Sequence, residues 1–406
     1  MIKLVILAAA IGASWTAPVA NGGDEKAGSQ DPEIWMSCAQ IIQRWGYPVE
    51  QYDVTTDDGY ILTIFRIPHG RDQVSQSKSK PVVFFQHGLE SSSYDWINNL
   101  PNEAAGFVFA DNGFDVWLGN FRGNMYGSKH VTLNPKNHAF WEFSFDEMAQ
   151  HDLPATINFA LNVSKASSLY YIGHSMGTTA AFAAFSRNKN LEKKVKTFYA
   201  LAPVATVKNI NGPIKYMAPF TSEIDLLAKL VGYDDFAPST PFMHVLAKYF
   251  CNNPVSNLVC DDVAFLLCGP DSHQLNTTRM PVYVAHTPAG SSTQTIVHYG
   301  QMVNSGKFDM FDYGRRDNRQ KYGQDTPPLY DVSQISVPIH LFWGQSDWLA
   351  DPKDVENLIP KLSNLVGNTY LTDFNHLDFV WGMRASAEVY WPIVRDLQKQ
   401  LSAQKK

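Results

Sequence analysis

The chain of 406 residues lacks several patterns that would assign it to a common class of protein. It contains no HExxH or CxxC motif and no glycine-rich phosphate loop, so we expect neither a metal ion nor another cofactor. The net charge of -6, with dispersed basic residues, argues against nucleic acid binding. No segment beyond the N-terminus is long and apolar enough to suggest a transmembrane anchor.

Cysteines are also few, with four in the chain. Cys251 and Cys260 are separated by a short segment that contains Asn-Asn-Pro, so they could close a small loop. Four cysteines allow three full connectivities, and the spacing alone leaves the pairing open.

The N-terminus has the features of a secretion signal. Lys3 precedes a short apolar run and small residues, which predicts a signal peptide over residues 1–20 and a flexible leader over 21–33. Two sequons, at Asn162 and Asn276, predict glycosylation. We therefore expect the secretory pathway, with the lysosome lumen or the extracellular space as the destination.

The residues Leu-Tyr-Tyr-Ile-Gly-His-Ser-Met-Gly at 169–177 are the most informative stretch. An apolar strand leads directly into Gly-x-Ser-x-Gly, and small residues that suit a closely packed helix follow. Strand, tight turn and helix in this order form a nucleophile elbow, in which the turn holds Ser175 in strained backbone geometry. Side chains at Gly173 and Gly177 would collide with neighbouring elements. We therefore predict that Ser175 is a catalytic nucleophile.

A serine nucleophile on this scaffold needs an acid and then a histidine further along the chain. Asp347 follows a predicted buried strand at 339–344, and His376 follows another at 369–372. Because reacting groups collect at the carboxyl ends of parallel strands, we predict a triad of Ser175, Asp347 and His376.

Two other aspartates compete with Asp347 for the role of the acid. Asp351 precedes a proline and suits the N-cap of a helix over 353–362. Asp378 is only two residues from His376, which is too close to orient the imidazole from behind.

The tetrahedral intermediate of acyl transfer needs two backbone N–H donors. We expect one from Met176, which follows the nucleophile, and the other from Leu89, in the loop after the apolar stretch 82–85. His87 and His174 lie in the same two loops, where we expect them to form hydrogen bonds without acting as the base.

A long stretch separates two strands of the predicted core. Residues 197–202 predict the strand after the elbow helix, and the next core strand does not begin until about Val337. Since one crossover helix would suffice there, most of the stretch is predicted to form a cap. We predict an α/β fold with a mostly parallel sheet in residues 34–205 and 331–406, and a mainly helical cap or lid over 206–330. The cap is rich in proline and apolar residues that could line an acyl pocket.

A series of motifs runs in order along the chain. It includes Thr-Asp-Asp-Gly-Tyr-Ile-Leu at 56–62, Gln-His-Gly-Leu at 86–89, Arg-Gly-Asn at 122–124 and Asn-His-Leu-Asp-Phe at 375–379. With these motifs the chain resembles the gastric and lysosomal acid lipase family, from about Trp35 to Leu397.

The resemblance implies an α/β-hydrolase fold, with the residues named above as triad and oxyanion hole. It also implies a disulfide between Cys251 and Cys260 in the cap, with Cys268 unpaired. Many members of the family carry Gln where this chain has Met176 and Ser where it has Phe121. The second difference lies near the site and bears on substrate preference.

The family's substrates are triacylglycerols and, in lysosomal members, cholesteryl esters. We therefore expect a secreted or lysosomal lipase that acts on neutral lipid esters at a lipid–water interface through an acyl-enzyme. The alternative is a carboxylesterase that acts on smaller soluble esters.

Overall fold

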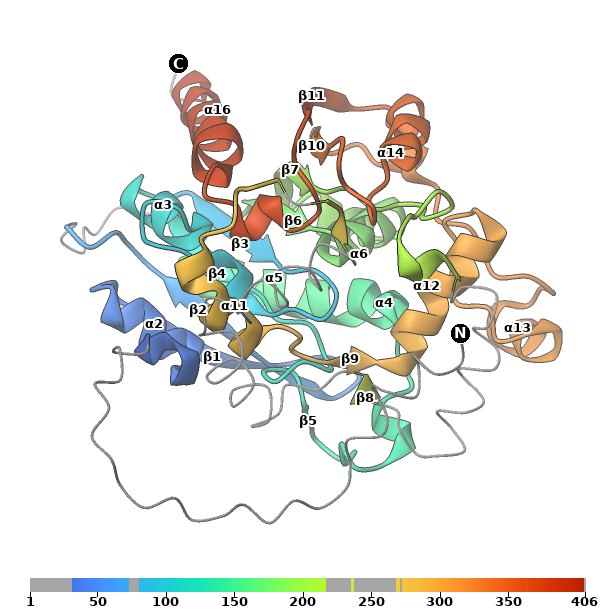
Figure 1. Cartoon of the computed structure of the whole chain (residues 1–406). Helices are drawn as coiled ribbons and strands as arrows, with labels where there is room; N and C mark the ends of the chain where they lie inside the picture. The colour runs from blue at the N-terminus through green and yellow to red at the C-terminus, as the bar shows by residue number, and fades with distance from the viewer. Residues whose placement is uncertain (1–30, 73–79, 217–234, 237–267, 271, 405–406) are drawn as a thin grey trace, which may run out of the picture. The chain divides into compact units, whose positions relative to one another are not determined.

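A nine-stranded sheet lies at the centre of the chain (Figure 1). The computed structural model describes residues 31–72, 80–216, 235–236, 268–270 and 272–404. The sheet order is β1-β2-β4-β3-β6-β7-β10-β11, and β5 pairs with β2. The strands are β1 Glu50–Thr55, β2 Tyr60–Ile67, β3 Val82–Gln86, β4 Asp115–Leu118, β5 Lys129–His130, β6 Leu169–His174, β7 Val195–Leu201, β10 Ile339–Gly344 and β11 Leu365–Leu371.

Six neighbouring strands of the sheet run parallel, namely β4, β3, β6, β7, β10 and β11. At one side β1, β2 and β5 add antiparallel pairings. Every residue of β3, β4 and β6 is buried, as expected for parallel strands covered on both faces. The edge strand β11 instead alternates between half-buried and exposed residues. The predicted mostly parallel α/β sheet is therefore confirmed.

Helices cover both faces of the sheet (Figure 1). On β7, Phe198 packs against Phe182 of α6, whereas the Tyr199 hydroxyl donates to Asp396 of α16. Because successive side chains of a strand point to opposite faces, α6 and α16 lie on opposite sides of the sheet. The α-helices of the described chain are α2 Cys38–Arg44, α3 Ala105–Asp111, α4 Phe145–Glu147, α5 Leu153–Ser164, α6 Met176–Arg187, α7 Lys189–Glu192, α11 Met280–His286, α12 Thr293–Ser305, α13 Arg315–Tyr322, α14 Pro352–Leu358, α15 Asp378–Trp381 and α16 Trp391–Ala403.

The segment between β7 and β10 is the predicted cap. Its described part contains α11, α12 and α13, together with a short antiparallel pair of β8 (Asp235–Phe236) and β9 (Ser291–Ser292). Residues 217–234 and 237–267 of the predicted cap lie outside the described residues, and so do Cys251 and Cys260. The boundaries of the cap stay a prediction.

The packed structure begins earlier than the predicted end of the leader at residue 33. Asp31 accepts a hydrogen bond from the Glu33 N–H at the start of a turn, Pro32–Trp35. Glu33 is buried and pairs with Arg279, 2.5 Å away. Burial raises the pKa of Glu33 although the Arg279 charge opposes the shift. This partner lies far along the chain, so local composition could not reveal it. The predicted signal peptide lies outside the described residues.

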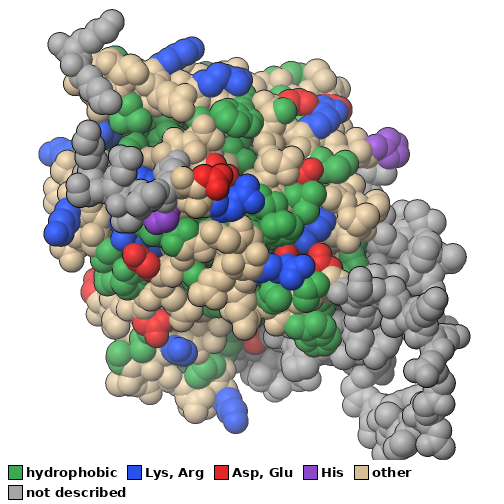
Figure 2. Space-filling view, turned by 90° about the vertical axis from the view of Figure 1, so that its left-hand side faces the viewer, with side chains coloured by type: hydrophobic (Ala, Val, Ile, Leu, Met, Phe, Trp, Pro, Cys, Tyr) green, Lys and Arg blue, Asp and Glu red, His purple; other side chains and the backbone are tan. Residues whose placement is uncertain are grey.

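The described surface mixes charges of both signs. On the face shown in Figure 2, Lys and Arg side chains are interspersed with Asp and Glu, and hydrophobic side chains lie between them. Within the described ranges, helices long and apolar enough to cross a bilayer are absent.

Candidate active site

Ser175 occupies the sharp turn between β6 and α6. Its backbone has φ 52° and ψ −117°, a strained conformation for a residue with a side chain. A Cβ on Gly173 would lie 2.8 Å from the backbone of Gly177, and one on Gly177 would lie 2.4 Å from the Gln86 carbonyl oxygen. The predicted strand, strained turn and helix are therefore confirmed, and the two glycines are required by close backbone approach.

The three residues of the predicted triad lie in hydrogen-bonding contact. His376 Nε2 is 2.7 Å from Ser175 Oγ, and His376 Nδ1 is 2.9 Å from each carboxylate oxygen of Asp347. Since Nδ1 faces two acceptors, it carries the proton, and Nε2 accepts from the serine hydroxyl. All three side chains are buried. They follow β6, β10 and β11 at the same edge of the parallel sheet.

The Asp347 carboxylate is fixed by the backbone that follows it. Its Oδ1 accepts from the N–H groups of Leu349 at 2.9 Å and Ala350 at 2.8 Å. The His376 N–H donates to the Cys268 carbonyl oxygen at 3.3 Å. These hydrogen bonds fix the positions of the Asp347 carboxylate and the His376 imidazole in the absence of substrate.

The two competing aspartates have other partners. Asp351 accepts from the Lys353 N–H at 2.9 Å and caps α14, as its sequence context predicts. Asp378 accepts from the Asn375 N–H and from the Ser272 hydroxyl, each at 2.7 Å.

The loop that carries Leu89 passes beside the serine. A Cβ on Gly88 would lie 3.1 Å from Ser175 Cβ, so the backbone before Leu89 touches the elbow. Met176 is the first residue of α6, where N–H groups have no intrahelical acceptor. Among the described residues, neither the Leu89 nor the Met176 N–H has a hydrogen-bond acceptor. Both N–H groups are thus available to a ligand beside Ser175.

His87 and His174 surround the site as neutral groups. His87 Nδ1 donates to the Gly88 carbonyl oxygen at 2.7 Å, and its Nε2 accepts from the Phe121 N–H at 3.1 Å. Burial lowers the pKa of His87 to about 4. His174 Nε2 donates to the His376 carbonyl oxygen at 2.9 Å, and burial also lowers its pKa, well below the usual value. Their predicted hydrogen-bonding role is confirmed.

Phe121, which departs from the family pattern, packs in this layer. Its ring lies 5.3 Å from the ring of His87, centroid to centroid, and it is buried. A serine at this position would remove that contact and leave space beside the oxyanion loop.

Several buried carboxyls near the site carry no sequence signal. Asp95 lies under the same loop and accepts from the Ser91 hydroxyl. Burial raises the pKa of Asp95 to about 7. Glu90, the residue after Leu89, has both carboxylate oxygens buried. In the sequence both residues stand in a polar loop and resemble solvated positions.

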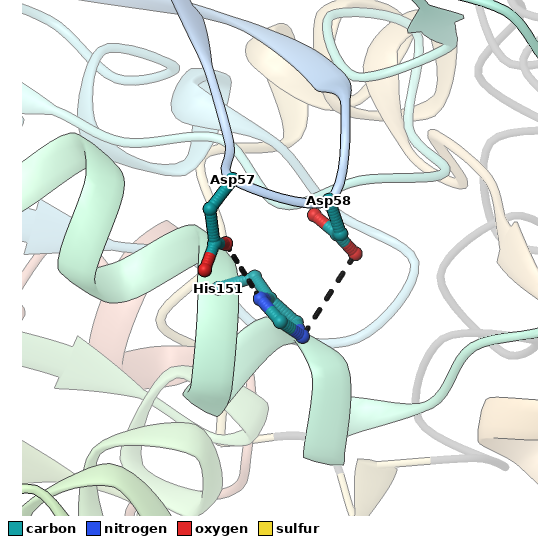
Figure 3. A group of neighbouring side chains, drawn as sticks. All are labelled: Asp57, Asp58 and His151. Atoms are coloured by element: carbon teal, nitrogen blue, oxygen red, sulfur yellow. Dashed lines mark hydrogen bonds and ion pairs between the residues drawn. The ribbon is translucent and has the colours of Figure 1, made fainter.

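A group of side chains with metal-ligand chemistry lies outside this site (Figure 3). His151 Nδ1 is 2.6 Å from Asp57 Oδ1, and Nε2 is 4.0 Å from Asp58 Oδ2. Asp58 is also paired with both terminal nitrogens of Arg122, at 2.7 and 2.9 Å. Arg122 in turn binds Asp152 through two nitrogens. The hydrogen bond of His151 and the ion pairs of Arg122 already account for the arrangement, which joins the β1–β2 turn to the segment before α5.

The free cysteines of the described chain are Cys38 and Cys268. Burial, together with the charges of Asp347 and Asp378, raises the pKa of Cys268 to about 12, so its thiol is inert as a nucleophile. The sequon residues Asn162 and Asn276 lie at the end of α5 and before the turn Thr277–Arg279. Asn162 is exposed and Asn276 is half-buried.

The sheet, the elbow and the groups around Ser175 define an α/β hydrolase. The family model "alpha/beta hydrolase fold" matches residues 81–382, and "Partial alpha/beta-hydrolase lipase region" matches residues 38–100. A soluble variant of monoglyceride lipase from Saccharomyces cerevisiae has the same fold, with a TM-score of 0.51 and 13% identity over 92% of this chain and 98% of that one.

Sequence relatives narrow the assignment. Lipase lipl-1 of Caenorhabditis elegans is 52% identical over 90% of this chain and 92% of its own length. Gastric triacylglycerol lipase of Rattus norvegicus is 48% identical over 91% and 94%. The chain therefore belongs to the acid lipase family that includes the gastric lipases, and it is a serine hydrolase of carboxylic esters.

Proposed function

We propose that this protein is a lipase that hydrolyses triacylglycerols and related neutral lipids such as cholesteryl esters, with Ser175 as its nucleophile. The observation that carries the proposal is the 2.7 Å contact between Ser175 Oγ and His376 Nε2. The names of the relatives, among them gastric triacylglycerol lipase, support the substrate class.

In the proposed mechanism, His376 Nε2 takes the proton of Ser175 as Oγ attacks the ester carbonyl carbon. The carbonyl oxygen becomes an oxyanion, which accepts hydrogen bonds from the N–H groups of Leu89 and Met176. Asp347 holds the imidazole in the required tautomer and stabilises the imidazolium that forms.

The intermediate collapses when His376 gives its proton to the leaving alcohol oxygen and the bond to that oxygen breaks. This leaves an acyl ester on Ser175. Water then attacks the acyl carbon while His376 takes one of its protons. The second tetrahedral intermediate releases the fatty acid and returns the proton to Ser175.

The proposal includes a route through the secretory pathway, ending in the lysosome or outside the cell. A signal peptide over residues 1–20, glycans on Asn162 and Asn276, and a Cys251–Cys260 disulfide belong to this proposal. Membership in a family with gastric lipases supports it.

The test compares an emulsified triacylglycerol with a short-chain ester across its solubility limit. A lipase is expected to show a sharp rise in rate once the ester forms a separate phase, because the cap then meets an interface. Hydrolysis that saturates below the solubility limit, with no rise above it, would instead indicate the carboxylesterase alternative. Ser175→Ala serves as the control for hydrolysis that does not depend on the site.

A further inference from the structure

Glu90 connects the oxyanion loop to the predicted cap. It follows Leu89 directly and has φ 57°, in the left-handed region that residues with a side chain rarely adopt. Its carbonyl oxygen accepts from the Ala289 N–H at 2.7 Å. The conformation of the residue next to the proposed oxyanion donor is therefore fixed by a contact with the segment 289–292.

Both oxygens of the Glu90 carboxyl are buried, and few polar groups lie near them to replace water. Neither of its oxygens has a hydrogen bond of normal geometry with a described residue, although the Gly290 backbone amide lies close enough to favour the charged form. Desolvation without a partner is costly for a charged group and far less costly for a neutral one. The site therefore favours the protonated carboxylic acid.

A second carboxyl, that of Asp235 in the predicted cap, acts electrostatically on Glu90. Asp235 lies on β8, which pairs with β9 so that Asp235 is opposite Ser292. The Oδ1 atom of Asp235 is also buried and without a partner among the described residues. Two buried carboxyls that act on each other cannot both ionise easily, so they titrate as a pair.

The pKa values of the two groups shift in the direction that this geometry requires. Burial raises the pKa of Glu90 well above its usual value, and the Asp235 charge raises it further. Burial raises the pKa of Asp235 to about 7. Within the described chain, Asp235 is the ionisable group that acts on Glu90. The other ionisable groups of the loop have hydrogen-bond partners: His87 donates to the Gly88 carbonyl oxygen, and Asp95 accepts from the Ser91 hydroxyl.

We propose that Glu90 is a positioning residue, which in its neutral form, together with Asp235, holds the Leu89 N–H toward the oxyanion. This inference rests on the proposed function of Ser175 and Leu89. At acidic pH both carboxyls are protonated and the loop stays docked on residues 289–292. As the pH rises, Asp235 loses its proton before Glu90 does, and the later ionisation of Glu90 leaves a charge without a counter-ion one residue from the oxyanion donor. That charge disfavours the docked loop and opposes the negative charge of the tetrahedral intermediate.

The consequence is that kcat falls at alkaline pH because a carboxyl of the oxyanion loop ionises, and not because a residue of the triad does. The Leu89 N–H acts on the oxyanion, which exists only after attack, so the loss falls on kcat and leaves KM nearly unchanged.

The experiment measures kcat and KM for a soluble p-nitrophenyl ester from acidic to alkaline pH, through the alkaline midpoint of kcat, in wild type and Glu90→Gln. Gln keeps the shape of the neutral acid and cannot ionise, so the alkaline midpoint of kcat is expected to rise by about one pH unit or more. Turnover at a pH one unit above the wild-type midpoint would then be about tenfold higher than in wild type. Asp235→Asn is the second variant: because the Asp235 charge raises the pKa of Glu90, its removal is expected to lower the midpoint.

Glu103→Gln is the matched control. Burial also raises the pKa of Glu103, but this residue lies before α3 and outside the oxyanion loop. Its midpoint is expected to coincide with that of wild type. Coincident midpoints for Glu90→Gln, Asp235→Asn and Glu103→Gln would overturn the proposal.

A readout that does not need activity covers the case in which a variant folds poorly. Infrared difference spectra of the wild type between acidic and alkaline pH are expected to contain several buried carboxylic acid components, including one from Asp95. One component is expected to be missing in Glu90→Gln and retained in Glu103→Gln. The same components in both variants would contradict the proposal. Full activity of Ser175→Ala would instead refute the proposed function, whatever the pH profiles show.

Discussion

His376 Nε2 lies 2.7 Å from Ser175 Oγ although 201 residues separate them in the chain. The contact exists because both residues stand just beyond the carboxyl ends of strands in one sheet. The roles of the side chains around this contact can be tested by substituting them one at a time.

Asp347→Asn tests the acid of the triad. The amide is close in shape but no longer favours the tautomer with a proton on Nδ1, so kcat is expected to fall by about 10⁴. Steady-state kinetics on a soluble ester measure the change. Asp351→Asn is the matched control, because asparagine caps a helix as well as aspartate does and the kcat should stay within about twofold of wild type.

If Asp351→Asn lowered kcat as strongly as Asp347→Asn, the assignment of the acid would be wrong. A normal melting temperature for both variants is required, since loss of folding would imitate loss of catalysis.

Arg122→Met tests the buried ion-pair cluster. Arg122 is 2% exposed and binds Asp152, which is 1% exposed, so the substitution leaves a buried carboxylate without its partner. Removing one member of such a pair is expected to lower the free energy of unfolding by about 3–5 kcal/mol, measured by denaturant titration. Adding Asp152→Asn should recover part of the loss.

Arg384→Met is the surface control for this prediction. Arg384 pairs with Asp373 and Glu388 in the solvent, and exposed pairs contribute about 1 kcal/mol or less. Equal destabilisation by both arginine substitutions would contradict a special role for the buried cluster.

Asp95→Asn tests the electrostatic cost of the buried Asp95 carboxyl. In the unfolded chain Asp95 ionises near its ordinary pKa of 3.8, but in the folded protein burial raises the pKa to about 7. The unfolded state therefore binds fewer protons between these values, and wild-type stability falls as the pH rises through the interval. Asn has no such cost.

The free energy of unfolding of Asp95→Asn, relative to wild type, is expected to increase by about 1.4 kcal/mol per pH unit across that interval. Denaturant titrations at several pH values measure it. Asp317→Asn, at an exposed position of α13, should run parallel to wild type. A constant difference between Asp95→Asn and wild type would show that Asp95 ionises normally in the folded protein.

The fold and the triad could be predicted because the sequence patterns that indicate them span only a few consecutive residues. The apolar run 339–344 coincides with β10, and Gly173 and Gly177 mark a turn that tolerates no Cβ. The predicted strand at 369–372 was less accurate, since β11 begins at Leu365. As an edge strand, β11 has the alternating burial of an exposed segment.

The partners of buried charges could not be predicted from local patterns. Glu33 pairs with Arg279, 246 residues away, and the charge of Asp235 acts on Glu90 from a different part of the chain. Each of these acids stands in a polar stretch of sequence, and only tertiary packing removes it from water. Burial without periodicity leaves no signal in the sequence.

The central claim, that Ser175 is the nucleophile, is tested most directly by covalent labelling with an alkylphosphonate ester that reacts with activated serines. We predict one phosphonyl group per molecule, loss of ester hydrolysis in proportion to labelling, and an adduct located on Ser175 by peptide mass spectrometry. An adduct on another residue, or full inactivation with Ser175 unmodified, would contradict it.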